Sequence, residues 1–505
     1  MRHVLRYPAT NASRSLTVAL LGSVALAACA VGPNYHRPAA ADPQRFKEAE
    51  GWKPAEPREA ASGTDWWSIY GDATLDELEK QIDISNQNLK ASEAAWRQAT
   101  ALVSQARAGL FPTIGVSATA TRSGGPGGRA TGATTGGTVT PLSHPVNEFE
   151  LFGTASWDID IWGKIRRTIE SDVANAQASE ADLAAARLSA QAALATDYIQ
   201  LRVADEQKQL LDKTVEGYKR SLEITENQYH VGVVAKADVI TAQTQLGGAQ
   251  SQQIAIGVTR ATLEHAIAVL IGKAPADFSL PPATLGTTVP VVPTGVPSIL
   301  LERRPDIAGA ERRMAASNAQ IGVAIAAYFP DLTLTGNYGF ASNVVSGLLR
   351  APNNFWSVGA AASDTLLDFG ARPAQVRQAR AAYDAAVANY RQTVLTAFQQ
   401  VEDELATLRI LEQQVDVQEQ TVKSADLSVQ LTLNQYRAGT VAYTSVVTAQ
   451  AIALGDAQTL LTIRQNRLVA SVALIQALGG GWDATSIGTA TGTAVTLAKK
   501  TASPH

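Results

Sequence analysis

The sequence has little of what disulfide frameworks, nucleic-acid surfaces and membrane-spanning helices require. Its 505 residues include a single cysteine, so no internal disulfide can form. The formal net charge of −4 argues against nucleic acid as a partner, because such binding needs a concentrated basic face. No uninterrupted run of about 20 apolar residues occurs, so we expect no transmembrane helix.

Residues for enzyme chemistry are also scarce. Six histidines are scattered along the chain. Only His230 and His265 fall inside the helical segments described below, and neither has a neighbour at metal-ligand spacing. The glycine-rich stretch 124–128 lies in low-complexity sequence and not between a strand and a helix, so it does not predict a phosphate-binding loop. We therefore expect no enzyme activity, no cofactor and no metal site.

Proline is absent from Val146 to Ala274, where helix-favouring alanine, leucine, glutamine and glutamate dominate. Apolar or small side chains recur there at the alternating steps of a coiled-coil seam, at Leu211, Val215, Tyr218, Leu222, Thr225 and Tyr229. The first helical run begins at Lys164, is interrupted at 231–235, and is followed by a second run from Ala237 to Ile271. The sequence predicts an extended helical hairpin whose first helix, of about 65 residues, is roughly 100 Å long.

This hairpin occurs twice. The motif Gln228-Tyr229-x-x-Gly232 returns 207 residues later as Gln435-Tyr436-x-x-Gly439. Upstream, Phe111-Pro112 returns 218 residues later as Phe329-Pro330, whereas Gly163 returns 207 residues later as Gly370. The offset therefore falls by 11 between Pro112 and Gly163, so a loop there is 11 residues longer in the first copy. We expect a first structural repeat over 65–285 and a second over 301–482. A proline-rich linker at 286–300 joins them, and a disordered tail at 483–505 follows.

Each repeat is expected to open on a helix. In the first repeat an amphipathic helix is predicted from about Leu75 to Ala108. In the second, Arg303-Arg304-Pro305-Asp306 indicates a helix start, since proline suits the first turn and an acid suits the N-terminal dipole. The two arginines are expected to form ion pairs.

The N-terminus has the pattern of a secretory signal over residues 1–28. A basic start precedes the apolar core Leu16–Ala27, which is too short to span a bilayer. The core ends in Leu26-Ala27-Ala28-Cys29, which resembles a bacterial lipoprotein cleavage box. We expect lipidation at Cys29, with 29–64 forming an extended, proline-rich strap. The alternatives are an ordinary signal peptide and a buried structural thiol.

Two short alternating segments lie between the helices of each repeat. Segments of about ten residues with period two fit membrane strands, and soluble hairpins packed on a core are the alternative. The expected lipid-facing residues are Ile114, Val116, Leu151, Leu332 and Leu334. A fourth, weaker segment lies around Trp356–Leu366. Four strands cannot close a barrel, and open edges are not tolerated in hydrocarbon, so a trimer sharing twelve strands is expected.

Together, these residues resemble the TolC-like outer-membrane factors, in particular the lipidated OprM/NodT-like branch. The matching motifs run in family order along nearly all of the chain after residue 28. They are Cys29-Ala30-Val31-Gly32-Pro33-Asn34-Tyr35-x-x-Pro38, Trp66-Trp67, Leu110-Phe111-Pro112, Trp157-Asp158-Ile159-Asp160-x-x-Gly163-Lys164, Pro297-Ser298-x-Leu300-Leu301-x-Arg303-Arg304-Pro305-Asp306, Phe329-Pro330, Tyr436-x-x-Gly439 and Ala477-Leu478-Gly479-Gly480-Gly481-Trp482.

The resemblance implies a mainly α fold with a small membrane β-barrel. It implies a homotrimer in which a 12-stranded barrel in the outer membrane continues as a periplasmic α-helical barrel. Such channels dock with a periplasmic adaptor and an inner-membrane transporter. Docking is then expected on the two hairpin tips, Val231, Gly232 and Val233 in the first repeat and Ala438, Gly439 and Thr440 in the second. The plainer alternative is that both glycines serve only as helix C-caps.

One feature departs from the family. Members often close the periplasmic end with carboxylates just after the second tip, but the matching positions here are Ser445, Thr448 and Ala451. The first repeat has Asp238 at the position equivalent to Ser445. Asp238, Ser445 and Thr448 are therefore the candidate gate residues, with a solvated helix-start acid as the alternative for Asp238.

The resemblance implies an exit duct of a tripartite, RND-type efflux system for drugs or other small molecules. The protein is expected in the outer membrane, in contact with its lipid and anchored at Cys29. Two alternatives remain: a non-conducting periplasmic adaptor or scaffold lipoprotein, and the outer-membrane duct of a type I protein secretion system.

Overall fold

The computed structural model describes residues 30–39, 43, 45–48, 65–124, 145–284, 303–484 and 487. Several expectations lie outside these residues. They concern the signal peptide 1–28, lipidation at Cys29, most of the strap, the linker 286–300 and nearly all of the tail.

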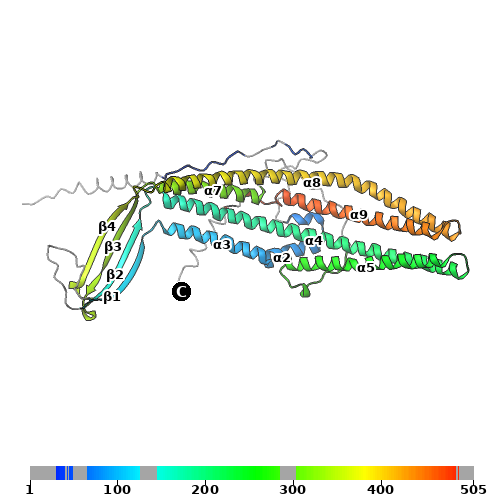
Figure 1. Ribbon diagram of the computed structural model, residues 1–505, viewed down its shortest axis with the longest axis horizontal. Coiled ribbons are helices and arrows are strands. Elements are labelled where there is room, and N and C mark those ends of the chain that lie inside the picture. The colour runs from blue at the N-terminus through cyan, green and yellow to red at the C-terminus, as the bar shows by residue number, and fades with distance from the viewer. Residues whose placement is uncertain are drawn as a thin grey trace, which may run out of the picture. The chain divides into compact units, whose positions relative to one another are not determined.

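The element order repeats itself along the chain (Figure 1). The first copy contains η1 (Trp66–Tyr70), α2 (Ala73–Ser85), α3 (Gln87–Ala108), β1 (Thr113–Ser123), β2 (Val146–Asp158), α4 (Lys164–His230), α5 (Lys236–Leu270) and η2 (Pro275–Asp277). The second contains α7 (Pro305–Ala326), β3 (Asp331–Ser342), η4 (Val345–Gly347), η5 (Ala351–Asn353), β4 (Asn354–Ser363), α8 (Ala371–Arg437) and α9 (Tyr443–Ala477).

These elements form two compact units, and each unit draws on both copies. One unit contains Met1–Pro38, Gln98–Ala176 and Arg312–Val387, and therefore all four strands. The other contains Ala39–Arg97, Gln177–Glu311 and Ala388–His505, and therefore both hairpin turns.

The strands form one antiparallel sheet in the order β1-β2-β3-β4. Neighbours in sequence are neighbours in the sheet, so the sheet is a meander. β1 and β4 are its edges, and among the described residues neither has a second partner strand. β4 begins two residues before the predicted Trp356 and ends at Ser363, just before Asp364. Both edges thus expose unpaired backbone donors and acceptors.

The predicted helical hairpins are confirmed. α4 and α8 each have 67 residues, and α5 and α9 each have 35. Both ends of α8 and of α9 lie 207 residues after the corresponding ends of α4 and α5. Near the turns the hairpins pack on each other through a shared apolar cluster that contains Ala242, Tyr436, Tyr443 and Val446.

The single helix predicted from Leu75 to Ala108 is wrong, because Asn86 interrupts it in an extended conformation. The Asn86 side chain accepts a hydrogen bond from Leu89 N and donates one to Leu270 O, the last carbonyl of α5. The equivalent residue in the second repeat is Arg304, whose Nη1 donates to Ala477 O, the last carbonyl of α9, at 2.9 Å. Both residues satisfy carbonyls that a helix end leaves unpaired. Arg304 also pairs with Asp306, which confirms the expected ion pair for that arginine.

The core of the second unit includes charged groups. Arg202 and Asp205 are buried, and Arg260 joins them through a 2.8 Å bond from its Nε to Asp205 Oδ1. Glu79 is fully buried, and burial, followed by the charges of Asp83 and Asp76, raises its pKa to about 9. Glu79 is therefore protonated at neutral pH.

By length and composition alone, α9 is long and apolar enough to cross a membrane, although the sequence predicted no transmembrane helix. Its apolar residues alternate with threonine and glutamine, so no continuous run forms. Leu460 and Ile463 of α9 pack with Val415 of α8, so this part of α9 belongs to the helical hairpin.

Candidate functional site

The strand register places the five predicted lipid-facing residues on one face of the sheet. Directly opposed residues share a face, and the pairs Val116–Gly153, Ala118–Leu151 and Trp157–Leu334 link strand to strand. Ile114 and Val116 are 81% and 78% exposed, while Leu151, Leu332 and Leu334 are half-buried. The polar residues of this face all lie near the loop end of the sheet, at Arg122, Asn147, Ser342 and Asn354.

The opposite face is mainly polar, with Ser117, Thr119, Glu150, Thr335 and Asn337 among its residues. Its main exceptions are Phe152 and Phe355, whose rings lie 6.1 Å apart on either side of Gly339. A Cβ atom at Gly339 would lie 2.3 Å from Phe152 Cβ. The glycine therefore allows the two rings to meet. Period-two patterning did not reveal this pair, because an isolated aromatic residue in a polar face carries no periodic signal.

Tryptophans gather where the strands meet the helices. Trp162 stacks on Phe329 with ring centroids 4.6 Å apart, and its Nε1 donates to Pro330 O at 3.0 Å. Trp157 Nε1 donates to Leu110 O at 3.0 Å. Indoles with a satisfied N–H and an apolar body are typical of membrane–water interfaces.

The two predicted tips are the turns of the hairpins. Gly232 has φ +79° and Gly439 has φ +75°, in the left-handed region that favours glycine. Gly232 N donates to Tyr229 O and Val233 N to Gln228 O, which is the Schellman pattern of a helix C-terminus. Gly439 and Thr440 repeat it with Tyr436 and Gln435. Both glycines therefore act as helix C-caps, a role that is compatible with docking at the same turns.

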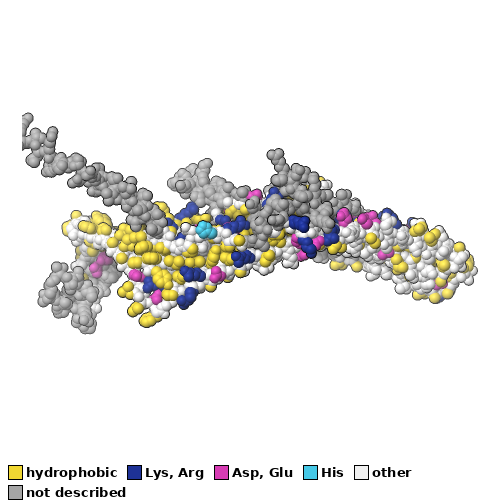
Figure 2. All heavy atoms as spheres, turned by 90° about the horizontal axis from the view of Figure 1, so that it is seen from above, with side chains coloured by type: hydrophobic (Ala, Val, Ile, Leu, Met, Phe, Trp, Pro, Cys, Tyr) yellow, Lys and Arg dark blue, Asp and Glu magenta, His cyan; other side chains and the backbone are white. Residues whose placement is uncertain are grey.

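The tips are also open surfaces. Val231 and Val233 are 74% and 63% exposed, and Ala438, Gly439 and Thr440 are exposed as well. A Cβ atom at Gly232 or Gly439 would have no neighbour within 4 Å. The face drawn in Figure 2 shows few charged side chains at the end of the helices where these turns lie, and the nearest charged residues in the sequence are Lys236 and Arg437. The geometry therefore leaves room for a partner that makes apolar and backbone contacts.

Behind the tips, polar side chains connect the first hairpin to the second. Gln450 Nε2 donates to Ser221 Oγ at 3.0 Å, and Gln245 Nε2 donates to Gln450 Oε1 at 3.1 Å. The hydroxyl groups of Tyr436 and Thr225 lie 3.2 Å apart. The seam pattern in the sequence predicts only a small residue at Thr225 and does not reveal this contact.

The candidate gate residues are not brought together as a charged cluster. Asp238, in the first turn of α5, is half-buried, whereas Ser445 and Thr448 of α9 are exposed. Thr448 Oγ1 donates to Thr444 O of its own helix. The pKa of Tyr443 is raised to about 12. Burial is the largest cause, the neighbouring phenols of Tyr436 and Tyr218 come next, and the nearby charge of Asp238 adds to them.

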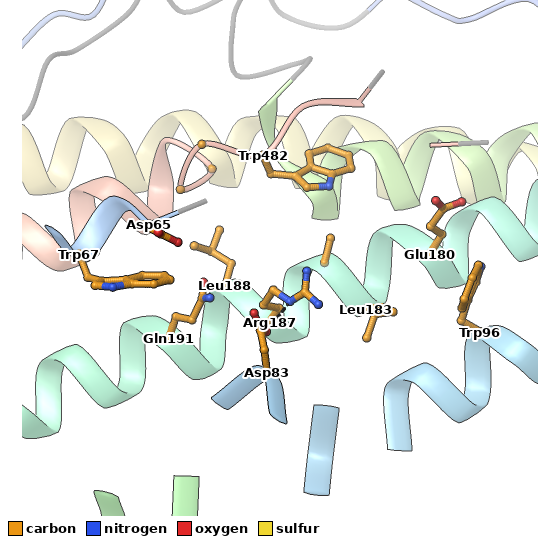
Figure 3. A pocket seen from close by; sticks show the side chains of 14 residues that line it. Asp65, Trp67, Asp83, Trp96, Glu180, Leu183, Arg187, Leu188, Gln191 and Trp482 are labelled. Atoms are coloured by element: carbon orange, nitrogen blue, oxygen red, sulfur yellow. Dashed lines mark ion pairs between the residues drawn. The ribbon is translucent and has the colours of Figure 1, made fainter. Parts of the chain in front are cut away.

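The second unit contains a cavity of about 540 Å³ (Figure 3). The indoles of Trp67, Trp96 and Trp482 line it, and Arg187 pairs across it with Asp83 at 2.7 Å. Within the described ranges no group of three or more His, Cys, Asp or Glu side chains is placed to hold a metal ion. The cavity thus offers aromatic walls and one satisfied ion pair.

Comparisons with known proteins point in one direction. The model of the family described as outer membrane efflux protein matches residues 78–273 and 296–480. The probable efflux pump outer membrane protein TtgC of Pseudomonas putida is 26% identical over 93% of this chain and 96% of its own length. The cation efflux system protein CusC of Escherichia coli is 28% identical over 91% and 97%. The solved outer-membrane channel OprN superposes with a TM-score of 0.82 at 30% identity, covering 90% of this chain and 100% of that one.

Proposed function

Because the chain belongs to the outer membrane efflux protein family, we propose that it is the outer-membrane exit duct of a tripartite, RND-type efflux system. The likeness to OprN confirms the predicted fold, with long helical hairpins and a small four-stranded sheet in each chain. One observation carries the proposal: the register gives a four-stranded sheet one continuous apolar face, one mainly polar face and two open edges. A lipid-facing wall of a water-filled barrel needs those features.

The open edges support a homotrimer. An open sheet edge in hydrocarbon leaves backbone groups without hydrogen bonds, so β1 of one copy pairs with β4 of the next. Three copies supply twelve strands. Exposed apolar side chains on the helices, including Ile254, Val258 and Val417, suit the same assembly, because a neighbouring copy would cover them.

Two measurements test the duct. The protein purified in detergent should migrate as a trimer that resists heating, and it should give single-channel conductance in a planar bilayer. A monomer without conductance would overturn the proposal and favour the adaptor or scaffold alternative.

The partners follow from the duct. It would work with a periplasmic adaptor at the tips and with an inner-membrane transporter, and the outer-membrane lipid would surround the strands. CusC is named for cations, whereas a TtgC of Pseudomonas putida that is 26% identical to this chain is named for toluene, so relatives of similar identity serve different pumps. The transporter that co-purifies with the chain would separate small-molecule efflux from type I protein secretion.

Tryptophan at both Gly232 and Gly439 should abolish export while leaving the trimer intact. The bulky side chain would occupy the open space over each turn, and the strand sequence is unchanged. Export by cells and cross-linking to the adaptor measure the effect.

Alanine at the same two positions is the matched control. It carries the cost of a positive φ, about 1 kcal/mol or more, without the bulk. Most export should remain with alanine. Wild-type export and cross-linking in the tryptophan variant would mean that both glycines are only caps.

Acylation at Cys29 belongs to the same proposal, with a lipid anchor on the periplasmic side of the outer membrane. Cells fed labelled palmitate should label the wild-type chain and not the Cys29→Ser variant. Equal labelling of the two would remove the anchor from the proposal, while the trimer is expected to form in both because the barrel itself lies in the membrane.

A further inference from the structure

The residues that follow Cys29 lie in a site built by α4 and α7. Val31 N donates to Trp162 O at 3.0 Å, and Asn318 Nδ2 of α7 donates to Pro33 O at 3.1 Å. Tyr35 packs on an apolar cluster of Ala174, Ala315 and Ala316. Residues 30–35 are called the clasp below. In the sequence these residues are only part of a motif, and the proposed function as an exit duct gives no reason for their contacts.

Arg167 is the centre of this site. It is 4% exposed, and its guanidinium donates to Val31 O at 3.2 Å, Gly32 O at 3.2 Å and Asn34 Oδ1 at 3.0 Å. Glu170 Oε2 accepts a fourth bond at 2.7 Å and balances the charge. A guanidinium has five N–H donors in a rigid plane, so it can hold several acceptors of a short extended segment at once.

Glycines make the close approach possible. A Cβ atom at Gly32, which has φ +98°, would lie 2.5 Å from Gly322 Cα. A Cβ atom at Gly322 would lie 2.8 Å from Arg167 Cγ. At Gly163, a Cβ atom would lie 2.8 Å from Ala30 Cα. Any side chain at these positions would displace either the clasp or the stem of Arg167.

We propose that the clasp is an intramolecular peptide ligand of this site and that Arg167 is its positioning residue. Seated there, Ala30 lies against Gly163, next to Trp162 of the interfacial tryptophans. The site thereby fixes the chain one residue after Cys29 at the junction of sheet and helices. A lipid on Cys29 would then be held at the same junction, and only this statement about the lipid rests on the acylation proposed above. The seating itself rests on the contacts of residues 30–35.

Chymotrypsin cleavage after Tyr35 tests the seating in full-length protein purified in detergent. Mass spectrometry follows the appearance of a chain that begins at His36. Arg167→Met keeps a stem of similar length over Gly322 and removes the hydrogen-bond donors. Cleavage should therefore become at least about tenfold faster, because that is the factor expected from losing one charge-assisted hydrogen bond. Arg167→Lys should fall between Met and wild type. Asn34→Ala, on the exposed side of the clasp, should also speed cleavage and decides the question if Arg167→Met does not fold.

Arg372→Met is the matched control, because Arg372 lies at the corresponding junction of the second repeat and bonds Asp364, Asp368 and Ala327 O. It should leave cleavage after Tyr35 at the wild-type rate. Cys29→Ser should also retain protection, which separates seating from acylation. Equal cleavage of wild type, Arg167→Met and Asn34→Ala would overturn the proposal. Equal acceleration in Arg372→Met, or loss of protection in Cys29→Ser, would overturn it as well, by assigning the protection to general stability or to the lipid.

Discussion

Arginine at Val116 or Leu334 should abolish the heat-resistant trimer. Both side chains lie on the apolar face of the sheet, away from its loop end. A charge facing lipid near the middle of the bilayer costs roughly 2–4 kcal/mol, and a homotrimer incurs that cost three times. Gel migration of unheated and heated membrane extracts measures the loss.

Ser117 and Thr335 provide matched controls on the same two strands. Each is the next residue along the chain and therefore lies on the polar face. Arginine there would face the water-filled lumen, so trimers should form at close to the wild-type level. Equal damage from all four substitutions would mean that the facing of the sheet, or its place in the membrane, is wrong.

Asp205→Ala should cause a large loss of stability in the unit that contains the hairpin turns. Asp205 pairs with Arg202 at 3.3 Å and with Arg260 at 2.8 Å, and it accepts a bond from Ala283 N. The side chains of Arg202 and Asp205 are 2% and 1% exposed. Removing one partner of a buried ion pair leaves an uncompensated charge and costs about 3–5 kcal/mol. A lower melting temperature by far-ultraviolet circular dichroism should report it.

Glu216→Ala removes an ion pair from the surface of the same helix and serves as the control. Glu216 pairs with Arg220 at 3.1 Å, and both side chains are more than half exposed. Exposed pairs four residues apart in a helix contribute about 0.3–0.5 kcal/mol, so the melting temperature should barely change. If the two variants have the same melting temperature, the buried network does not stabilise the fold.

The helical hairpins and the sheet could be predicted from the sequence because each has a periodic signal. The interruption at Asn86 could not be read from local propensity, since its cause is a bond to Leu270 O from far along the chain. The repeat nevertheless contains a signal for this interruption. Pro305, which starts α7, lies 218 residues after Gln87, so the repeat predicts that a helix also starts at Gln87, as α3 does.

Buried polar contacts were the least predictable part. Arg167, Arg202 and Asp205 all occur in α4, a long helix rich in charged residues, where a charged residue normally indicates a solvated face. Their burial depends on partners distant in sequence, such as the clasp and residues 280–283. The tips were easier to locate, because a glycine that interrupts two equivalent seams is a local signal that occurs twice.

The equal lengths of the two hairpins restrict which insertions and deletions the chain can tolerate. One residue added to α4 would turn everything beyond it by about 100° and advance it by about 1.5 Å. If the addition lay before Ser221 and Thr225, these residues would no longer face Gln450 and Tyr436. Seven added residues would nearly restore the direction in which Ser221 and Thr225 point, because they make almost two full helical turns. They would also place the turn of the first hairpin about 10 Å beyond the turn of the second. Length can therefore change only by coordinated steps in all four helices, whereas the loop between β1 and β2 is free to differ from its counterpart by 11 residues.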